Sequence, residues 1–213
     1  MPPPARSRRV DHAGGPRRGR GFGLTGPPPP PARRPRAPRL DPDTRRALIA
    51  DAAERLLAEH DPLLVTFDEV ADAAGVSRAL VHTYLGDRRG LIDAVQVQIV
   101  GRLDTWVGHG LRRATTTPAR LRAIVQGVLA FVEAEQDAWG VLGASGGFDH
   151  PALHGVRARW VAALRADEDL DEVRAQVAVS ALLGSAGPWV NRGVDPAAVE
   201  AALAPLLRDD TDG

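Results

Sequence analysis

The chain has 213 residues, which is enough for one or two domains, and its 44% content of hydrophobic residues is sufficient for a core. It contains no cysteine, so disulfide frameworks and thiolate metal sites are excluded. The net charge of zero conceals a segregation: residues 1–40 hold ten arginines against one acid, a net of +9, and residues 41–213 are correspondingly −9.

Membrane and export signals are missing from the sequence. No run of about 18 apolar residues occurs, so we expect no membrane-spanning helix. The first residues lack the apolar segment of a secretory signal. Together with the absence of cysteine, these features lead us to expect a cytoplasmic protein with no membrane partner.

Residues 1–40 contain 11 of the 18 prolines and almost no large apolar side chains. Such a segment cannot bury enough surface to offset the entropy of ordering, so we expect a disordered arm. Its arginine clusters could contact DNA phosphates or enter a minor groove. A passive tail without a specific role is the alternative.

A helix is predicted from Asp41-Pro42 to about His60, since Asp41 can cap it and proline is favoured at the first helical position. Apolar side chains three and four residues apart would form a stripe that covers two following helices. The stripe consists of Leu48, Ile49, Ala52, Ala53, Leu56 and Leu57. Arg45 lies near the helix start, where it could contact phosphate or remain a solvated surface charge.

The stretch from Thr66 to Leu91 predicts two short helices and the start of a longer one. Thr66 and Glu69 have the spacing of a capping box, and Gly75 marks the stop of the first helix. Ser77 can cap a second helix over Arg78–Leu85. Its inward side chains are predicted to be Val81, Tyr84 and Leu85, and its outward ones Arg78, Ala79, Leu80, His82 and Thr83.

Two short capped helices joined at a glycine have the geometry that lays one helix in a DNA major groove. The same pattern also occurs in ordinary helical hairpins of all-α domains. Residues 41–91 hold six arginines against ten acids, so bulk charge does not favour DNA there. Affinity would depend on Arg78, on Arg88 and on the helix N-terminal amides at Thr66 and Ser77.

The sequence after Arg88 predicts further helices, with no convincing strand pattern and no repeat. A glycine-rich loop is expected at 143–147, and a kink or break is expected near Pro188. The predicted helices cover 88–113, a segment opening at Thr117-Pro118, 151–166, 169–190, and a last one from Pro196 to about Arg208. The fold class is therefore all-α.

No enzyme motif is present in the sequence, and no cofactor is expected. Nucleotide-binding and hydrolase signatures are missing. His150 and His154 stand one helical turn apart, a spacing at which two histidines can share a metal. They have no accompanying glutamate or cysteine, so we predict no metal site and no catalytic residues.

The segment GVSRALVHTYLGDRRGL resembles the signature of TetR-type transcriptional repressors, and the detailed match covers Asp41–Leu91. The positions that fall on the family pattern are Gly75, Val76, Ser77, Val81, Tyr84, Arg88 and Leu91. His82 stands where the family usually has tyrosine, a phosphate contact in many members. Leu85 replaces the usual phenylalanine, and Arg88 replaces the usual lysine with its charge kept.

The resemblance implies a three-helix head with a helix-turn-helix at 41–88, a ligand-binding and dimerisation domain at 89–208, and a tail at 209–213. The head would bind double-stranded operator DNA, and the last two helices would form a homodimer. A small, apolar effector would release the DNA. The implied DNA-binding residues are Arg45, Thr66, Ser77, Arg78, Ala79, Leu80, His82, Thr83, Tyr84 and Arg88.

The resemblance also turns the large aromatic side chains into candidates for an effector pocket. These are Trp106, Phe131, Trp139 and Trp160, for which ordinary core packing is the alternative. A second function class also stays open: an all-α ligand carrier or an interaction adaptor with a vestigial helix-turn-helix.

Overall fold

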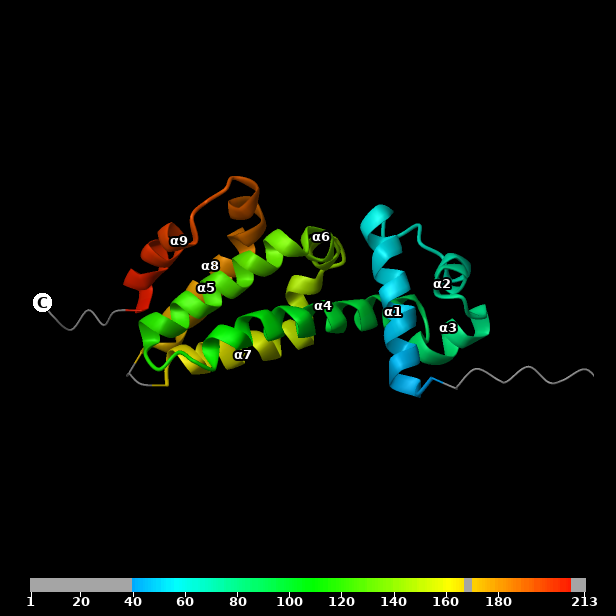
Figure 1. The fold of residues 1–213 in the computed structure, drawn as a ribbon, viewed down its shortest axis with the longest axis horizontal. Helices are drawn as coiled ribbons and strands as arrows, with labels where there is room; N and C mark the ends of the chain where they lie inside the picture. The colour runs from blue at the N-terminus through cyan, green and yellow to red at the C-terminus, as the bar shows by residue number, and fades with distance from the viewer. Residues whose placement is uncertain (1–39, 167–169, 208–213) are drawn as a thin grey trace, which may run out of the picture. The chain divides into compact units, whose positions relative to one another are not determined.

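The computed structural model describes residues 40–166 and 170–207, and over these ranges it consists of helices without a strand (Figure 1). The all-α prediction is confirmed. Three predictions fall on residues outside the described ones: the arm before Leu40, the start of a helix at Asp169, and the end of the chain from Arg208. None of the described helices is both long and apolar enough to span a membrane.

The first three helices, which we call the head, are α1 (Pro42–Glu59), α2 (Phe67–Ala74) and α3 (Arg78–Leu85). Their starts are the capping sites expected from the sequence. The Asp41 carboxylate accepts from the Thr44 amide at 2.9 Å, and the Ser77 hydroxyl accepts from the Leu80 amide at 3.3 Å. Gly75 has φ +65°, a left-handed conformation that turns the chain between α2 and α3.

The remaining helices, which we call the body, begin with α4 (Arg88–Leu111), which leaves the head and runs on beside α5 and α7 (Figure 1). The body continues with α5 (Thr117–Ala134), α6 (Gln136–Ala144), the 3-10 turn η1 (Gly147–Asp149), α7 (Pro151–Leu164), α8 (Glu172–Asn191), α9 (Pro196–Leu203) and the 3-10 turn η2 (Ala204–Leu207). The helix α1 packs against α4 and α6 as well as against α2 and α3. The head is therefore joined to the body by packed helices as well as by the chain.

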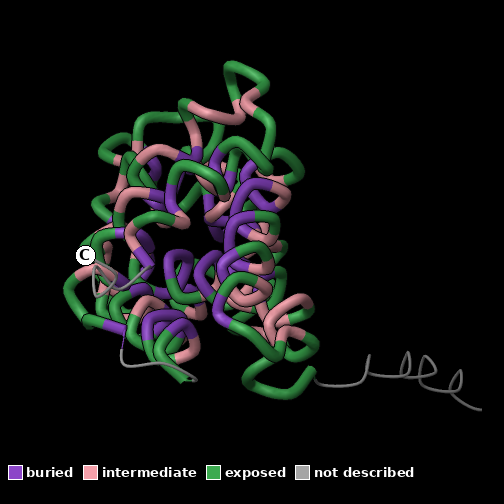
Figure 2. The backbone as a smooth tube through the Cα atoms, turned by 90° about the vertical axis from the view of Figure 1, so that its left-hand side faces the viewer, coloured by how far each residue is buried: buried purple, intermediate pink, exposed green. Residues whose placement is uncertain are grey.

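The buried residues lie on the sides of the helices that face one another, whereas the outer turns are exposed (Figure 2). Within this core α4 and α5 approach each other closely at two glycines. A Cβ added to Gly127 would lie 2.7 Å from the Cα of Val107, and one added to Gly110 would lie 2.9 Å from the Cβ of Ala123. The α4–α5 contact therefore leaves no room for side chains at these two glycines.

The structure differs from the sequence predictions for the body in two places. Helix α6 was not predicted, and it extends into the stretch expected to be a glycine-rich loop, so that the turn is shorter. This helix has no side-chain cap, which explains why the sequence carries no start signal for it. Helix α8 also does not break at Pro188 and continues to Asn191. The proline has no N–H to donate to the carbonyl of Gly184, one turn earlier, and the helix ends three residues after it.

Candidate nucleic-acid interface

Helix α3 has one buried side and one open side. Val81 and Leu85 are buried in the core, whereas Ala79, His82 and Thr83 are exposed. Leu80 and Tyr84 are half-buried, and Tyr84 packs against the core. The buried side of α3 is therefore fixed against the core. Its exposed side, mainly in the first two turns, is available to a partner.

Arg78, the first residue of α3, reaches back to α2. Its Nη1 donates to the Asp68 carboxylate at 2.9 Å. Asp72, the acid of α2 nearest to Arg78 in sequence, is one helical turn further along α2. The two paired side chains are 60% and 64% exposed, and ion pairs this open to water contribute little to stability. The guanidinium can therefore exchange Asp68 for another acceptor at low cost.

His82 is fixed from two directions. Its ring stacks on Phe67 of α2 with a centroid distance of 4.3 Å and an interplanar angle of 12°. Its Nδ1 lies 2.9 Å from the Gly86 carbonyl oxygen, and a carbonyl can only accept, so Nδ1 carries the proton in this contact. The Nε2 atom is then the ring position left to meet a ligand, on the exposed side of α3.

Thr83 uses its hydroxyl within the helix. The Oγ1 atom donates to the Ala79 carbonyl at 2.8 Å, a bond that threonine often makes one turn back along a helix. The methyl group of Thr83 and that of exposed Ala79 are therefore the parts available for contact. Both are suited to the thymine methyl rather than to a polar base edge.

The start of α2 is closed by the expected capping box. The Thr66 hydroxyl accepts from the Glu69 amide at 3.3 Å, and the Glu69 carboxylate accepts from the Thr66 amide at 2.7 Å. The backbone bond from Thr66, followed by its side-chain bond, lowers the pKa of Glu69. Since the capping groups already occupy these positions, Thr66 and Ser77 act first as helix caps.

Arg88 is the first residue of α4, and its side chain is bonded to the head. Its Nη1 donates to the carbonyl of Val65, in the loop between α1 and α2, at 3.0 Å. The side chain is half-buried, so only part of the guanidinium remains open to a phosphate. Arg45, in the first turn of α1, is likewise half-buried.

The predicted pocket aromatics separate into two places in the body. Trp106, Phe131 and Trp139 meet edge to face at centroid distances of 6.3 and 6.4 Å, and Phe148 extends this series at 5.2 Å from Trp139. Trp160 lies apart, buried, with its Nε1 donating to Asp104 at 3.1 Å. These contacts are those of packed side chains, and the assignment of an effector pocket to them stays a prediction.

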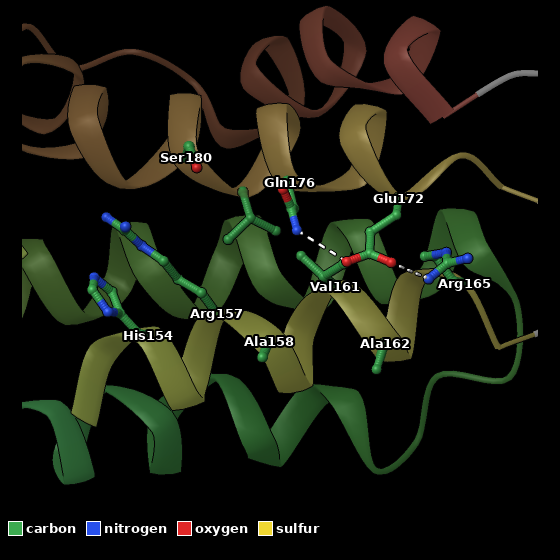
Figure 3. A pocket seen from close by; sticks show the side chains of 10 residues that line it. His154, Arg157, Ala158, Val161, Ala162, Arg165, Glu172, Gln176 and Ser180 are labelled. Atoms are coloured by element: carbon green, nitrogen blue, oxygen red, sulfur yellow. Dashed lines mark hydrogen bonds and ion pairs between the residues drawn. The ribbon is translucent and has the colours of Figure 1, made fainter. Parts of the chain in front are cut away.

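A cavity of about 450 Å³ lies between α7 and α8 (Figure 3). Its lining residues include Ala158 and Ala162 of α7 and Gln176 and Ser180 of α8. The Nε of Arg157, at its edge, is buried without a hydrogen-bond partner in the described part of the chain. Sequence reasoning missed this cavity, although small residues four apart on a helix were a signal for it.

His150 and His154, which stand one helical turn apart in the sequence, are not arranged to share a metal ion. Both ring nitrogens of His150 are used, since Nδ1 accepts from the Ala152 amide at 3.1 Å and Nε2 lies 2.8 Å from Asp93. His154 instead lines the α7–α8 cavity. Over residues 40–166 and 170–207, no group of three or more metal-ligating side chains is assembled.

Comparisons with known proteins identify the head. Residues 49–95 match the family described as bacterial regulatory proteins, tetR family. The transcriptional regulator BetI of Rhizobium meliloti is 34% identical over 87 residues, which are 41% of this chain and 42% of that protein. The transcriptional activator FasR of Mycolicibacterium smegmatis is 33% identical over 98 residues, 46% and 45% of the two chains. The matches thus span less than half the length of these relatives.

The similarity to solved structures covers the body as well as the head. A tetR-family transcriptional regulator from Streptomyces coelicolor superposes with a TM-score of 0.61 at 22% identity, over 78% of this chain and 82% of that one. At this identity the agreement is one of fold. The head therefore matches the tetR-family model over residues 49–95, and the helical body shares its fold with a TetR-family structure.

Proposed function

We propose that the protein is a one-component transcriptional regulator that binds operator DNA as a homodimer and responds to a small molecule. The head, residues 41–88, is the DNA-binding part, and residues 89–208 form the dimerisation and effector part. The observation that carries the proposal is α3, which is packed on one side and presents Arg78, His82 and Thr83 on the other. A helix held in this way has the form that enters a major groove.

The groups of α3 match the three kinds of contact that DNA recognition needs. Arg78 can donate two bonds to guanine O6 and N7 once it leaves Asp68. The methyl groups of Ala79 and Thr83 fit a thymine methyl. We assign phosphate contacts to His82, which is held by Phe67 and Gly86, and to the open part of Arg88 at the start of α4.

The homodimer is supported by the outer face of α8. Val173 and Val177 are one helical turn apart and are 64% and 48% exposed. Helix α9, the next helix along the chain, exposes alanines at 197, 198, 201 and 202, which allow close helix packing. A second copy along α8 and α9 would remove this apolar face from water and would also cover the α7–α8 cavity.

We propose that the effector is a small, apolar molecule bound within the body and that its binding releases DNA, as in a repressor. The aromatic series from Trp106 to Phe148 supports an apolar site, since it concentrates polarizable surface between α4, α5 and α6. FasR is an activator, so the direction of regulation must be measured for this chain. No catalytic step forms part of the proposal.

A gel-shift titration of the full chain with DNA from its own promoter region tests the proposal. We expect a discrete complex that weakens steeply with salt, because phosphate contacts release counterions. Light scattering at micromolar concentration should give the mass of two chains. A carrier or an adaptor with a vestigial helix-turn-helix would give no sequence-dependent shift, and that result would refute the proposal.

A further inference from the structure

The middle of α4 carries an arginine that is bonded to two other helices at once. The Nε of Arg102 donates to the Glu135 carboxylate at 2.8 Å. Its Nη1 and Nη2 donate to the two carboxylate oxygens of Glu54, at 3.1 and 2.5 Å. All three guanidinium nitrogens are therefore engaged, in the two-pronged geometry that makes arginine–carboxylate pairs directional.

The two carboxylates belong to opposite sides of the head–body junction. Glu54 lies on α1 of the head, and Glu135 closes α5 and opens α6 in the body. One turn earlier on each helix, Gln98 of α4 donates to Asp51 of α1. Two polar links, one helical turn apart, thus join α1 to α4. Of these two, the Arg102 link is the one that also reaches the start of α6.

The Arg102 cluster is partly shielded from water, so it is stronger than an ordinary surface pair. The side chains of Arg102, Glu54 and Glu135 are 32%, 16% and 27% exposed. Burial, the largest single effect, lowers the pKa of Arg102, but the bonds and charges of the two glutamates outweigh it and raise that pKa above its ordinary value. The cationic form is therefore the one that this place in the fold favours.

The surroundings of the cluster are acidic. A hollow of about 470 Å³ between α1 and α6 is lined by Glu54 and Glu135 and by two further acids, Glu59 and Asp137, with Arg55 as the one base among its lining residues. Without the Arg102 charge, Glu54 and Glu135 would repel each other across this hollow. Arg102 thus holds together two helices that their own charges would push apart.

We propose that Arg102 is a positioning residue for DNA binding: it locks α1, and with it the head, against α4 and the start of α6. This inference rests on the proposed function, because the orientation of the head matters only if two heads must fit two half-sites. In a dimer, a rotation of each head relative to its body changes the spacing between the two copies of α3. A shift of α6 would reach the head through Glu135, Arg102 and Glu54.

The experiment measures head orientation and DNA spacing separately. The chain has no cysteine, so Asp72→Cys on α2 and Gln126→Cys on α5, both exposed, would be its only thiols. Dyes on these sites report the head–body distance by single-molecule energy transfer, with the labelled chain diluted into excess unlabelled chain. Unlabelled protein is titrated with operators whose half-site spacing is native or lengthened by two base pairs.

The test variants are Arg102→Met and Glu135→Gln, and the matched control is Arg159→Met. Arg159 pairs with Asp104 of the same helix α4 at 2.6 Å, but this pair joins α4 to α7 and does not touch the head. The control therefore loses an arginine ion pair of α4 while the Arg102 cluster stays intact. Thermal melting of all variants measures the general loss of stability that they share.

We expect Arg102→Met to broaden the head–body distance distribution and to reduce the preference for the native spacing by about 2- to 30-fold, the range for residues that couple two sites. Glu135→Gln should have a smaller effect of the same sign, and Arg159→Met should have neither. An unchanged distance distribution in Arg102→Met would overturn the inference. A broadened distribution with an unchanged spacing preference would overturn it as well. If the wild-type chain binds no DNA, the proposed function fails, and the distance measurement still shows whether Arg102 holds the head.

Discussion

Replacement of Arg78 by alanine separates a base-reading arginine from a surface ion-pair residue. In the free protein Arg78 bonds to Asp68, and both side chains are mostly exposed. A pair of this kind stabilises a protein by about 0.2–1 kcal/mol, so the Arg78→Ala variant should melt almost as the wild type does. Any large effect must therefore be found in the DNA complex.

The expected loss on DNA is much larger than the loss of stability. A bidentate arginine–guanine contact discriminates by about 1–3 kcal/mol, which corresponds to about 5- to 150-fold at one base position of each half-site. The assay is selection of bound sequences from a random pool, done in parallel with wild type and with Arg78→Ala. We expect the preference to relax at one symmetric pair of positions and to persist elsewhere.

The Asp68→Ala variant is the control for Arg78. It removes the ion-pair partner and leaves the arginine free, so it should keep the wild-type base preference and bind DNA at least as tightly. If Arg78→Ala and wild type select the same sequences with the same affinity, Arg78 is a surface ion-pair residue. Base reading would then have to come from His82 and Thr83.

The remaining predictions concern Arg88, the packing of the body and the arm. Arg88→Ala should weaken binding to all DNA sequences and reduce the salt slope by about one phosphate contact, and it should also lower the melting temperature, since its bond to the α1–α2 loop is lost. An unchanged salt slope would remove Arg88 from the phosphate contacts. Gly127→Ala should cost about 1–3 kcal/mol in denaturant unfolding, because its Cβ would press on Val107. Gly140→Ala, where a Cβ meets nothing within 4 Å, is the matched control and should not destabilise. Deleting residues 1–39 removes ten arginines and should lower non-specific DNA affinity while the melting temperature stays unchanged; a large fall in melting would contradict this.

The head was largely predictable because its boundaries are encoded by local chemistry. Asp41, Thr66 and Ser77 are side-chain caps in the structure as in the sequence, and Gly75 has the left-handed backbone that a stop requires. Such signals act over three or four residues, which is the range that a sequence pattern can read. Helix α6 has no such cap, so it could not be recognised in the same way.

The contacts of the site were less predictable than its location. Spacing identified the exposed side of α3, but the partner of Arg78 is ten residues away on α2 and depends on how two helices cross. The same holds for the stacking of His82 on Phe67. The Arg102 cluster joins residues 33 and 48 positions apart in sequence, and local periodicity carries no information about such pairs.

The tryptophans and the tyrosine of this protein lie in different parts of the structure. All four tryptophans lie on body helices, namely α4, α6, α7 and α8, and the only tyrosine of the chain, Tyr84, lies in the head. Indole emission therefore originates entirely in the body. A compound that quenches or shifts this emission changes the surroundings of a body tryptophan, and a spectral change caused by DNA bound at the head would report communication from the head to the body. Effector screening and the detection of head-to-body communication therefore need no external dye.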